Sequence, residues 1–466
     1  MNKPYRLVIS SQHHKQLTNH LFPGDGFEAA AILLCTRSSN YRLLVKELVF
    51  VAHKECKVRL PDRITWPGAA IEEAIDRADL EGLSIILIHS HPGGMLKFSN
   101  LDNDSDLRVI PSLFEGVSSP AIPHGSAIMT PDGAMRARIY QRDLSLNNVE
   151  SIICSSEDIT IWRNPGAGSL GKCPMAFSSA MREDLQHLTA CIVGVSGTGS
   201  IVAEQLARMG IGRLILIDFD KVEFKNLNRI INSTLEDATT GCYKTTMFAS
   251  KVASYRDDID IHCFESSITC REAIEAAGNA DMLFCCVDSF EGRQICDRIA
   301  TSFLLPLFDV AVTIPTRKTN DNGRAIADVC GRLDYVYPGS PSLFDRRVYS
   351  PEALRKEYLL SVAPEDHDEQ VNAGYLKGVT EEAPSVIALN MRAASACVME
   401  FIARRYPYRH ESNSQFSRTI FSLATGEEEY LNDTAFKCSD TSLLGRGLSE
   451  PLLGMPCFTI QKEVAA

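Results

Sequence analysis

The chain has 466 residues, of which 45% are hydrophobic and 23% are charged. This composition is typical of a globular protein with a large core and argues against a disordered chain. The formal net charge of −12 argues against a nucleic-acid-binding protein, which usually presents a basic face. No apolar run approaches the ~18 residues of a membrane span, and no secretory signal opens the chain. We therefore expect a cytoplasmic protein without a membrane partner, whose 15 cysteines are mostly reduced and buried.

The hydrophobic pattern predicts an α/β protein with two domains. A mixed α/β domain is expected over 1–145, a linker or arm over 146–180, and a second domain with a C-terminal extension over 181–466. In the first domain we expect strands at 27–36, 42–52 and 83–89, a helix at 69–80, and a hairpin formed by 126–129 and 135–140. From residue 188 strands alternate with helices, which predicts a Rossmann-like, doubly wound, mostly parallel sheet. Its elements are expected at 189–193, 200–209, 213–218, 244–255, 282–287 and 305–312, with a long helix at 385–405.

Two histidines end one of the predicted strands of the first domain. His89 and His91 are two residues apart, so the period of a strand puts both imidazoles on one face. Two imidazoles and a carboxylate make a zinc site of the catalytic type, with the fourth position left to water. Such a site also needs a carboxylate that accepts a proton from water and passes it on. Glu28 is the best candidate for this base, and Glu47 is a weaker one.

The pattern H-x-H-x7-S-x2-D over residues 89–102 resembles the JAMM (JAB/MPN) metallopeptidases. The resemblance covers roughly the first 140 residues. It implies that His89, His91 and Asp102 bind zinc, that Glu28 is the general acid/base, and that Ser99 hydrogen-bonds the reacting carbonyl oxygen. Members of that family cut after the C-terminal glycine of ubiquitin-like proteins.

The second domain opens with a strand, a glycine-rich turn and a helix. The turn, GVSGTG, contains Gly194, Gly197 and Gly199, and Ser196 stands where a strict G-x-G-x-x-G pattern has its second glycine. Such a turn aims backbone N–H groups and the positive end of a helix at phosphate. The turn therefore predicts a nucleotide site, although a dehydrogenase would have a similar one.

Charged residues beyond this turn favour ATP over a nicotinamide cofactor. Asp218 ends the next strand, where a carboxylate can bind ribose hydroxyls. Arg229 and Lys244 can neutralise phosphates, and Asp288 can hold Mg²⁺. Residues 185–405, above all D-x-D-x-V-E-x-x-N-L-N-R, resemble the ThiF/MoeB superfamily, which includes the ubiquitin-activating enzymes. The resemblance implies that Asp218 binds ribose, that Asn226, Arg229 and Lys244 bind phosphates, and that Asp288 holds Mg²⁺ and positions the attacked α-phosphate.

Three acceptors are open for an acyl group after adenylation. Related enzymes of this subgroup tend to have C-x-x-C pairs, but here residues 338–345 read PGSPSLFD, and the C-terminal counterpart reads CSDT. A four-thiolate structural zinc is therefore not expected. Cys330 is the first candidate nucleophile, Ser342 is the second, and direct release to a partner protein is the third. Family members often take an arginine from a dimer mate, and neither Arg163 nor Arg182 is a clean match for that role.

The leading hypothesis is an enzyme of ubiquitin-like conjugation. The second domain would adenylate the C-terminal glycine of a ubiquitin-like protein with ATP and Mg²⁺, and the zinc isopeptidase would process or remove that protein. The resemblance further implies a homodimer, a conjugating enzyme as a further partner, and a bacterial conjugation operon such as one used in antiphage defence. The alternatives are activation of a sulfur-carrier protein for thiocarboxylate formation and a non-catalytic scaffold for a ubiquitin-like fold.

Overall fold

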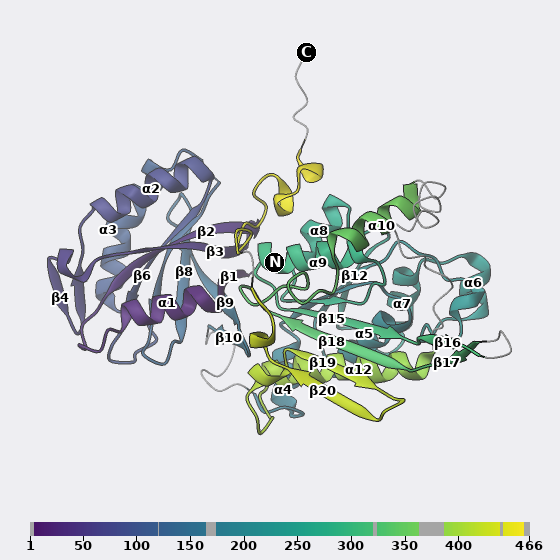
Figure 1. Cartoon of the computed structure of the whole chain (residues 1–466). Coiled ribbons are helices and arrows are strands. Elements are labelled where there is room, and N and C mark those ends of the chain that lie inside the picture. The colour runs from purple at the N-terminus through teal and green to yellow at the C-terminus, as the bar shows by residue number, and fades with distance from the viewer. Residues whose placement is uncertain are drawn as a thin grey trace, which may run out of the picture. The chain divides into compact units, whose positions relative to one another are not determined.

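The computed structural model describes residues 4–119, 121–164, 174–319, 324–362, 386–438 and 441–460 (Figure 1). The chain forms two compact units. The first unit comprises residues 1–172, 301–304 and 441–466, and the second comprises residues 173–300 and 305–440. In the described ranges, no helix is both long and apolar enough to cross a membrane.

The first unit is built on one sheet that closes through a pairing of its first strand, β1, with β9. The strand order is β1-β3-β2-β6-β7-β8-β9-β10, and β1 also pairs in parallel with β9, which closes the sheet on itself. The strands are β1 (Tyr5–Ser10), β2 (Ala30–Ser39), β3 (Arg42–Phe50), β6 (Ser84–Ser90), β7 (His124–Met129), β8 (Met135–Tyr140), β9 (Leu146–Ser155) and β10 (Ile159–Arg163). A separate short hairpin is formed by β4 (Val58–Leu60) and β5 (Arg63–Thr65).

Helices cover both faces of this sheet. Successive residues of a strand face opposite sides, so the apolar runs in β2 and β6 contribute side chains to two cores. On one side Leu33 and Ile88 pack with α1 (Ser11–Leu21). On the other side Leu34 and Leu87 pack with α2 (Ala69–Glu81) and α3 (Asn100–Gly116). Figure 1 shows α1 apart from α2 and α3, with the strands between them.

The predicted linker over 146–180 is wrong for its first half. Residues 146–163 form β9 and β10, which belong to the first sheet. Residues 165–173 of that predicted linker lie outside the described residues. The C-terminal segment also differs from the prediction, because residues 441–466 group with the first unit. There Gly445 O accepts a hydrogen bond from Thr36 Oγ1 at 2.5 Å, and Leu448 N donates to Arg37 O at 3.0 Å.

The second unit confirms the predicted Rossmann-like α/β fold. Its sheet has the order β13-β12-β11-β14-β15-β18-β19-β20. The pairings from β13 to β15 are parallel, whereas β18, β19 and β20 add on by antiparallel pairing. The strands are β11 (Thr189–Val193), β12 (Arg213–Ile217), β13 (Asp260–Phe264), β14 (Met282–Cys285), β15 (Leu307–Thr313), β18 (Cys330–Val336), β19 (Arg418–Ser422) and β20 (Glu427–Leu431), and a separate hairpin joins β16 (Thr316–Lys318) to β17 (Arg324–Ile326).

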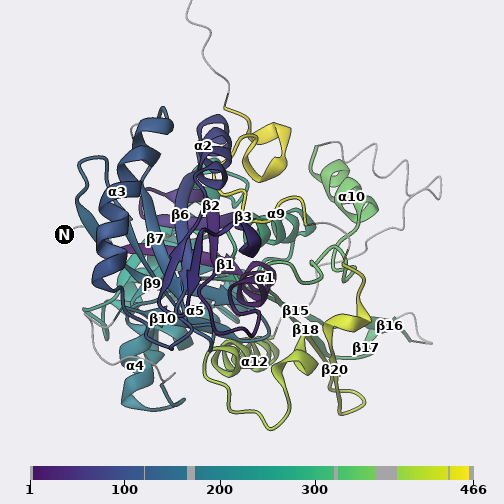
Figure 2. The ribbon, with the colours of Figure 1, turned by 90° about the vertical axis from the view of Figure 1, so that its left-hand side faces the viewer.

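The strand order of this sheet reverses at β11. β11 comes first in the chain, β12 and β13 extend the sheet on one side of it, and β14 and β15 extend it on the other. In open α/β sheets, ligands bind at the carboxyl ends of the strands at this switch point. The helices are α4 (Ser179–Leu185), α5 (Gly197–Met209), α6 (Leu235–Thr240), α7 (Lys244–Val252), α8 (Arg271–Ala277), α9 (Phe290–Ser302), α10 (Pro351–Val362) and α12 (Ile387–Arg405). The long helix α12 packs on α5 and β15. Figure 1 and Figure 2 both show this helix beside β18.

Candidate functional site

Local pairing brings Glu28 next to the two histidines. Glu28 lies two residues before β2, and the first residue of that strand, Ala30, pairs with His89 at the end of β6. Ser90 fastens the two segments together, because its backbone N donates to Ala29 O at 2.9 Å and its Oγ accepts from Ala29 N at 2.8 Å. The Glu28 carboxylate and the two imidazoles lie within 4.8 Å of one another.

Asp102 completes this cluster from the first turn of α3. Its Oδ1 lies 3.1 Å from His89 Nε2, its Oδ2 lies 3.6 Å from His91 Nε2, and the two imidazole nitrogens lie 3.1 Å apart. Donor atoms of a tetrahedral zinc ion with bonds near 2.05 Å are separated by about 3.3 Å. The residues present therefore fit a zinc ion, with Glu28 beside it.

Neighbouring atoms fix how these ligands are aimed. His91 Nδ1 contacts Met95 O at 2.7 Å, which turns Nε2 toward the cluster. Ser99 is the N-cap of α3, where its Oγ accepts from Asp102 N at 3.2 Å and its backbone N donates to Asp102 Oδ2 at 2.5 Å. Ser99 keeps its hydroxyl proton for a further acceptor. The contact of Met95 with His91 has no signature in the sequence, because a backbone oxygen can come from any residue type.

The electrostatics of the cluster differ between its two carboxylates. Burial raises the pKa of Glu28 to about 7, although the nearby imidazoles oppose the shift. Burial alone would raise the pKa of Asp102 as well, but hydrogen bonds from His89 and His91 outweigh it and hold that pKa well below its usual range. Asp102 is therefore suited to bind a cation, and Glu28 is suited to exchange a proton near neutral pH. The alternative base, Glu47, lies on β3 and pairs with Arg77 of α2.

In the second unit, the glycine turn lies at the carboxyl ends of β11 and β14. Gly194 has a φ of +87°, a conformation that L side chains rarely adopt. A Cβ at Gly199 would overlap the carbonyl oxygen of Gly194, and a Cβ at Gly197 would overlap the amide of Asn390 and lie 3.3 Å from Arg229 Cδ. The turn is therefore closed tightly, and Arg229 and the first turns of α12 meet the start of α5.

Asp218 and Lys244 lie at the neighbouring strand end. The buried Asp218 carboxylate accepts hydrogen bonds from Val195 N at 2.7 Å and Asp220 N at 2.8 Å. Burial raises the pKa of Asp218, while the charge of Lys244 opposes that shift. Lys244 Nζ donates to Asp220 Oδ2 at 2.6 Å, with only 4% of the lysine exposed. Sequence reasoning missed Asp220 as the partner of Lys244, although the D-x-D pattern contains it.

The other residues predicted to bind ATP differ in their burial. Asn226 is buried, and its Oδ1 accepts from Glu223 N at 3.1 Å. Arg229 is half-buried, and its Nη1 donates to Lys225 O at 2.9 Å. Asp288 is exposed beyond the end of β14, and its carbonyl oxygen accepts from Arg293 Nη1 at 3.2 Å. Cys286 N donates to Val193 O at 2.8 Å, which holds this segment against the glycine turn.

The two candidate nucleophiles differ in their surroundings, because Cys330 begins β18 and Ser342 lies in a hydrogen-bonded turn. Partial burial and the neighbouring Asp328 carboxylate raise the pKa of Cys330 to about 11. Ser342 Oγ donates to Asp345 Oδ2 and accepts from Asp345 N, at 2.9 and 3.1 Å. This arrangement supports a turn, and Ser342 has no histidine among its hydrogen-bond partners in the described structure. Within residues 185–405, the stretch that resembles the ThiF/MoeB superfamily, residues 320–323 and 363–385 lie outside the described residues.

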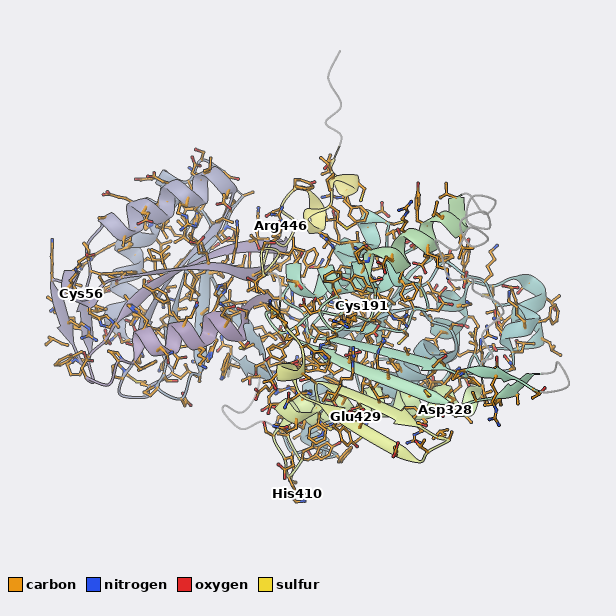
Figure 3. The ribbon with its side chains drawn as sticks, viewed as in Figure 1. Cys56, Cys191, Asp328, His410, Glu429 and Arg446 are labelled. Carbon is orange, nitrogen blue, oxygen red and sulfur yellow. The ribbon has the colours of Figure 1, made fainter. Side chains whose placement is uncertain are left out.

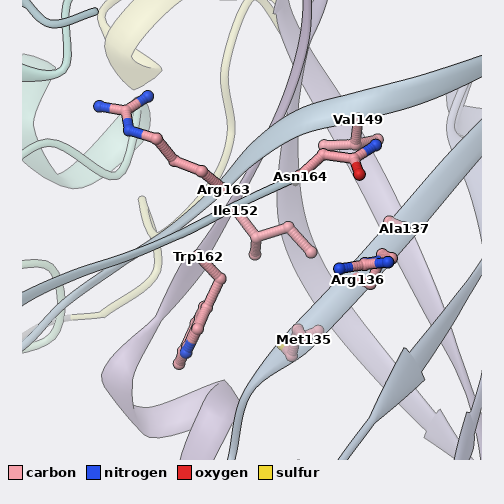
Figure 4. A pocket seen from close by; sticks show the side chains of 8 residues that line it. All are labelled: Met135, Arg136, Ala137, Val149, Ile152, Trp162, Arg163 and Asn164. Carbon is pink, nitrogen blue, oxygen red and sulfur yellow. The ribbon is translucent and has the colours of Figure 1, made fainter. Parts of the chain in front are cut away.

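The two arginines without an assigned role lie on different elements. Arg163 ends β10 in the first unit and lines a shallow pocket together with Trp162 and Arg136 (Figure 4). In that view the guanidinium of Arg163 points away from that of Arg136, so the two charges do not converge on one ligand. Arg182 lies on α4, and its side chain packs against Gly210 at the end of α5.

Comparisons with known proteins concern the second unit. Residues 173–391 match the model of the ThiF family. The chain is 28% identical over 173 residues to ubiquitin-like modifier-activating enzyme 5 of Bombyx mori, covering 35% of this chain and 40% of that protein. The enzyme of the same name from Drosophila melanogaster is 30% identical over 174 residues, covering 35% and 39%. The chain thus spans about 40% of the length of these curated relatives.

Solved structures include MccB of E. coli in complex with MccA-N7isoASN. It has 17% sequence identity and a TM-score of 0.42, and the match covers 54% of this chain and 66% of that chain. The family match and the described glycine turn fall on the same stretch of the sequence. Residues 173–391 of this chain are therefore a ThiF-family domain.

Proposed function

We propose that the ThiF-family domain uses ATP to adenylate the C-terminal glycine of a ubiquitin-like protein, and that the first unit is a zinc isopeptidase for the same protein. The observation that carries the adenylation proposal is the convergence of a glycine turn, a buried aspartate and a buried lysine at the switch point of the sheet. The similarity to ubiquitin-like modifier-activating enzymes supports the substrate class.

Each residue of this site has a role in the proposed reaction. The backbone N–H groups at the start of α5 face the phosphates, and Asp218 accepts hydrogen bonds from ribose hydroxyls. Asn226, Arg229 and Lys244 bind the phosphates, with Lys244 leaving Asp220 to do so. Asp288 would hold the Mg²⁺ ion that neutralises phosphate charge. A carboxylate oxygen of the terminal glycine attacks the α-phosphorus, the bond to the β-phosphate oxygen breaks, and pyrophosphate leaves with that electron pair.

Pyrophosphate exchange tests this proposal. Purified chain, ATP, Mg²⁺ and labelled pyrophosphate are combined with candidate partner proteins that end in glycine. We expect exchange that requires the terminal glycine and disappears in Asp288→Ala. Asp257→Ala is the matched control, because Asp257 is exposed and precedes β13, at the amino ends of the strands. Absence of exchange with every glycine-ending partner, from a chain that still binds one of them, would favour a scaffold instead.

The identity of the active partner separates the two adenylating functions. A ubiquitin-like protein with a conjugating enzyme supports conjugation, whereas a sulfur carrier with a sulfurtransferase supports thiocarboxylate formation. Both share the chemistry up to the acyl-adenylate.

A specific observation favours the peptidase as a second activity. The distances among the Nε2 atoms of His89 and His91 and the carboxylate oxygens of Asp102 are close to those between the ligands of a tetrahedral zinc ion. A zinc ion held there would polarise the scissile carbonyl and lower the pKa of water. Glu28 accepts the proton of the attacking water and returns it to the leaving amine. Ser99 donates its hydroxyl proton to the oxygen of the reacting carbonyl.

The peptidase proposal is tested with a ubiquitin-like protein extended beyond its terminal glycine. Glu28→Gln should keep bound zinc and lose cleavage by about 10²–10⁴-fold, because it removes only the proton acceptor. Glu47→Gln is the control and should cleave normally. Equal cleavage by Glu28→Gln and the unmodified chain would remove Glu28 from the mechanism.

A further inference from the structure

One buried arginine holds the start of α3 from another part of the first unit. Arg138 lies on β8, and only 4% of its surface is exposed. Its Nε donates to Asp106 Oδ2 at 2.8 Å, and its Nη2 lies 2.7 Å from the same oxygen. Its Nη1 donates to Asn103 Oδ1 at 2.5 Å. Both acceptors belong to α3, so the guanidinium ties this helix to the sheet.

The same guanidinium also contacts the segment that enters α3. It lies over the ring of Phe98, 3.9 Å from the ring centroid, and Phe98 directly precedes the N-cap Ser99. A cation over an aromatic face is attractive, and more so where water is excluded. Arg138 thus contacts the chain on both sides of Asp102.

Further bonds make this network stiff. Asp106 accepts a hydrogen bond from Ser126 Oγ on β7 and another from Tyr140 OH at 3.0 Å. Arg138 Nε also lies 3.0 Å from Ser126 Oγ. A buried carboxylate and guanidinium that satisfy one another resist displacement, because movement would leave a charge unpaired.

The network leads from Asp102 back to the histidine strand. Asp106 lies one helical turn after Asp102, on the same face of α3. Arg138 pairs with Ser126 across β8 and β7, and on the next pair of strands Ile128 of β7 pairs with His89 of β6. The position of Asp102 relative to His89 is therefore set through Arg138 and these strands.

We propose that Arg138 is a positioning residue that places Asp102 as the third zinc ligand, without touching zinc or substrate itself. This inference rests on the zinc site proposed above. A zinc ion requires the third donor to lie near a corner of the tetrahedron. Lysine at position 138 keeps the charge but lacks the planar fork through which different nitrogens of Arg138 bond Asp106 and Asn103.

Metal binding tests this inference without any peptidase assay. The probes are Zn²⁺ alone, measured by competition with a coloured chelator, and Co²⁺ alone, measured by its visible absorption. The variant is Arg138→Lys, and the matched control is Arg136→Lys, which makes the same change on the same strand. His89→Ala identifies the metal bound at this site, because the chain has other potential ligands among its 15 cysteines.

We expect Arg138→Lys to weaken zinc binding about 10–100-fold and to reduce the tetrahedral Co²⁺ absorption, as other outer-shell substitutions do. Arg136→Lys should match the unmodified chain. If Arg138→Lys does not fold, Asn103→Ala serves instead, because Asn103 is exposed and its substitution removes a single hydrogen bond. We expect Asn103→Ala to weaken zinc binding about 3–10-fold.

Two outcomes are adverse and distinguishable. Unchanged zinc affinity and Co²⁺ absorption in a folded Arg138→Lys variant would overturn the role of Arg138 and leave the zinc site standing. An unmodified chain that binds no more zinc than His89→Ala would overturn the zinc site and, with it, this inference.

Discussion

The carboxylate of Asp328 lies beside the thiol of Cys330, at the start of β18. Asp328, which Figure 3 labels, accepts hydrogen bonds from Ser422 Oγ and from Ala424 N, so its carboxylate is held in place near the pairing of β18 with β19. Partial burial and this negative neighbour raise the pKa of Cys330 to about 11. A thiol in such surroundings is a poor nucleophile at neutral pH, because the thiolate is the reactive form.

Alkylation of Cys330 tests this relationship. At pH 8, we expect iodoacetamide to label Cys330 more slowly than the exposed Cys457. Asp328→Asn should speed labelling of Cys330, since it removes the negative charge but keeps a carbonyl oxygen for the backbone donors. Labelling of Cys457 should stay unchanged. Rapid formation of a thioester on Cys330 in the unmodified chain at neutral pH would contradict this prediction and make Cys330 the acyl acceptor.

Lys244 should matter more to adenylation than other lysines of its helix. Its ammonium is buried and is held by Asp220 at the proposed nucleotide site. Replacement therefore removes a positive charge that is already in place for the phosphates of ATP. We expect Lys244→Gln to slow ATP–pyrophosphate exchange by about 100-fold, as loss of one aimed donor does in other enzymes. Lys251→Gln is the control, because Lys251 lies on the same helix but pairs with Asp237. Equal exchange rates in the two variants would remove Lys244 from the phosphate site.

Gly199→Ala should disrupt the nucleotide turn. The new Cβ would overlap Gly194 O and lie 3.1 Å from Cys286 Cβ, so both the turn and the Asp288 segment must shift. Overpacking of this kind costs about 1–3 kcal/mol. We expect the melting temperature to fall by several degrees and ATP affinity, measured by calorimetry, to fall more than tenfold. Gly68→Ala is the control, since a Cβ there meets no atom within 4 Å. Unchanged ATP affinity in Gly199→Ala would show that the turn does not bind the nucleotide.

Local patterns predicted β11, β12, β14 and β15 of the second sheet and pointed to the main side chains of both candidate sites. Alternation of apolar strands and helices is a property of neighbouring residues, and so is the two-residue spacing of His89 and His91. The strand β9 was missed because its first half is polar and its partner β1 is far away in the sequence. Contacts at such distances leave no local period to detect.

The supporting side chains were harder to predict for a different reason. Arg138 and Asp106 are charged, and charged residues normally indicate a solvated surface. Only the packing of α3 against β8 buries them together. The contact between Gly197 and Asn390 likewise depends on how α12 lies on α5. Sequence patterns therefore indicated which residues can do chemistry, and packing determines which residues hold them in place.

A buried aspartate should make the stability of the second unit depend on pH. Asp297, on α9, accepts hydrogen bonds from Leu343 N at 3.0 Å and Tyr349 OH at 2.8 Å. Burial raises its pKa to about 6. In the unfolded chain the pKa is near 3.9, so between about pH 4 and 6 only the folded form keeps the proton. The free energy of unfolding should therefore fall as the pH rises through this range, by up to about 3 kcal/mol.

Asp297→Asn isolates this effect. Asparagine cannot ionise, yet it keeps an oxygen for the backbone donor. We expect the melting temperature of the unmodified chain to fall relative to that of Asp297→Asn between pH 4 and pH 7, measured by calorimetry at matched ionic strength. Asp257→Asn, at an exposed position, should follow the unmodified chain. If the difference between Asp297→Asn and the unmodified chain is the same at pH 4 and pH 7, the buried carboxyl does not titrate in this range, because only a proton held by the folded state alone can produce the slope.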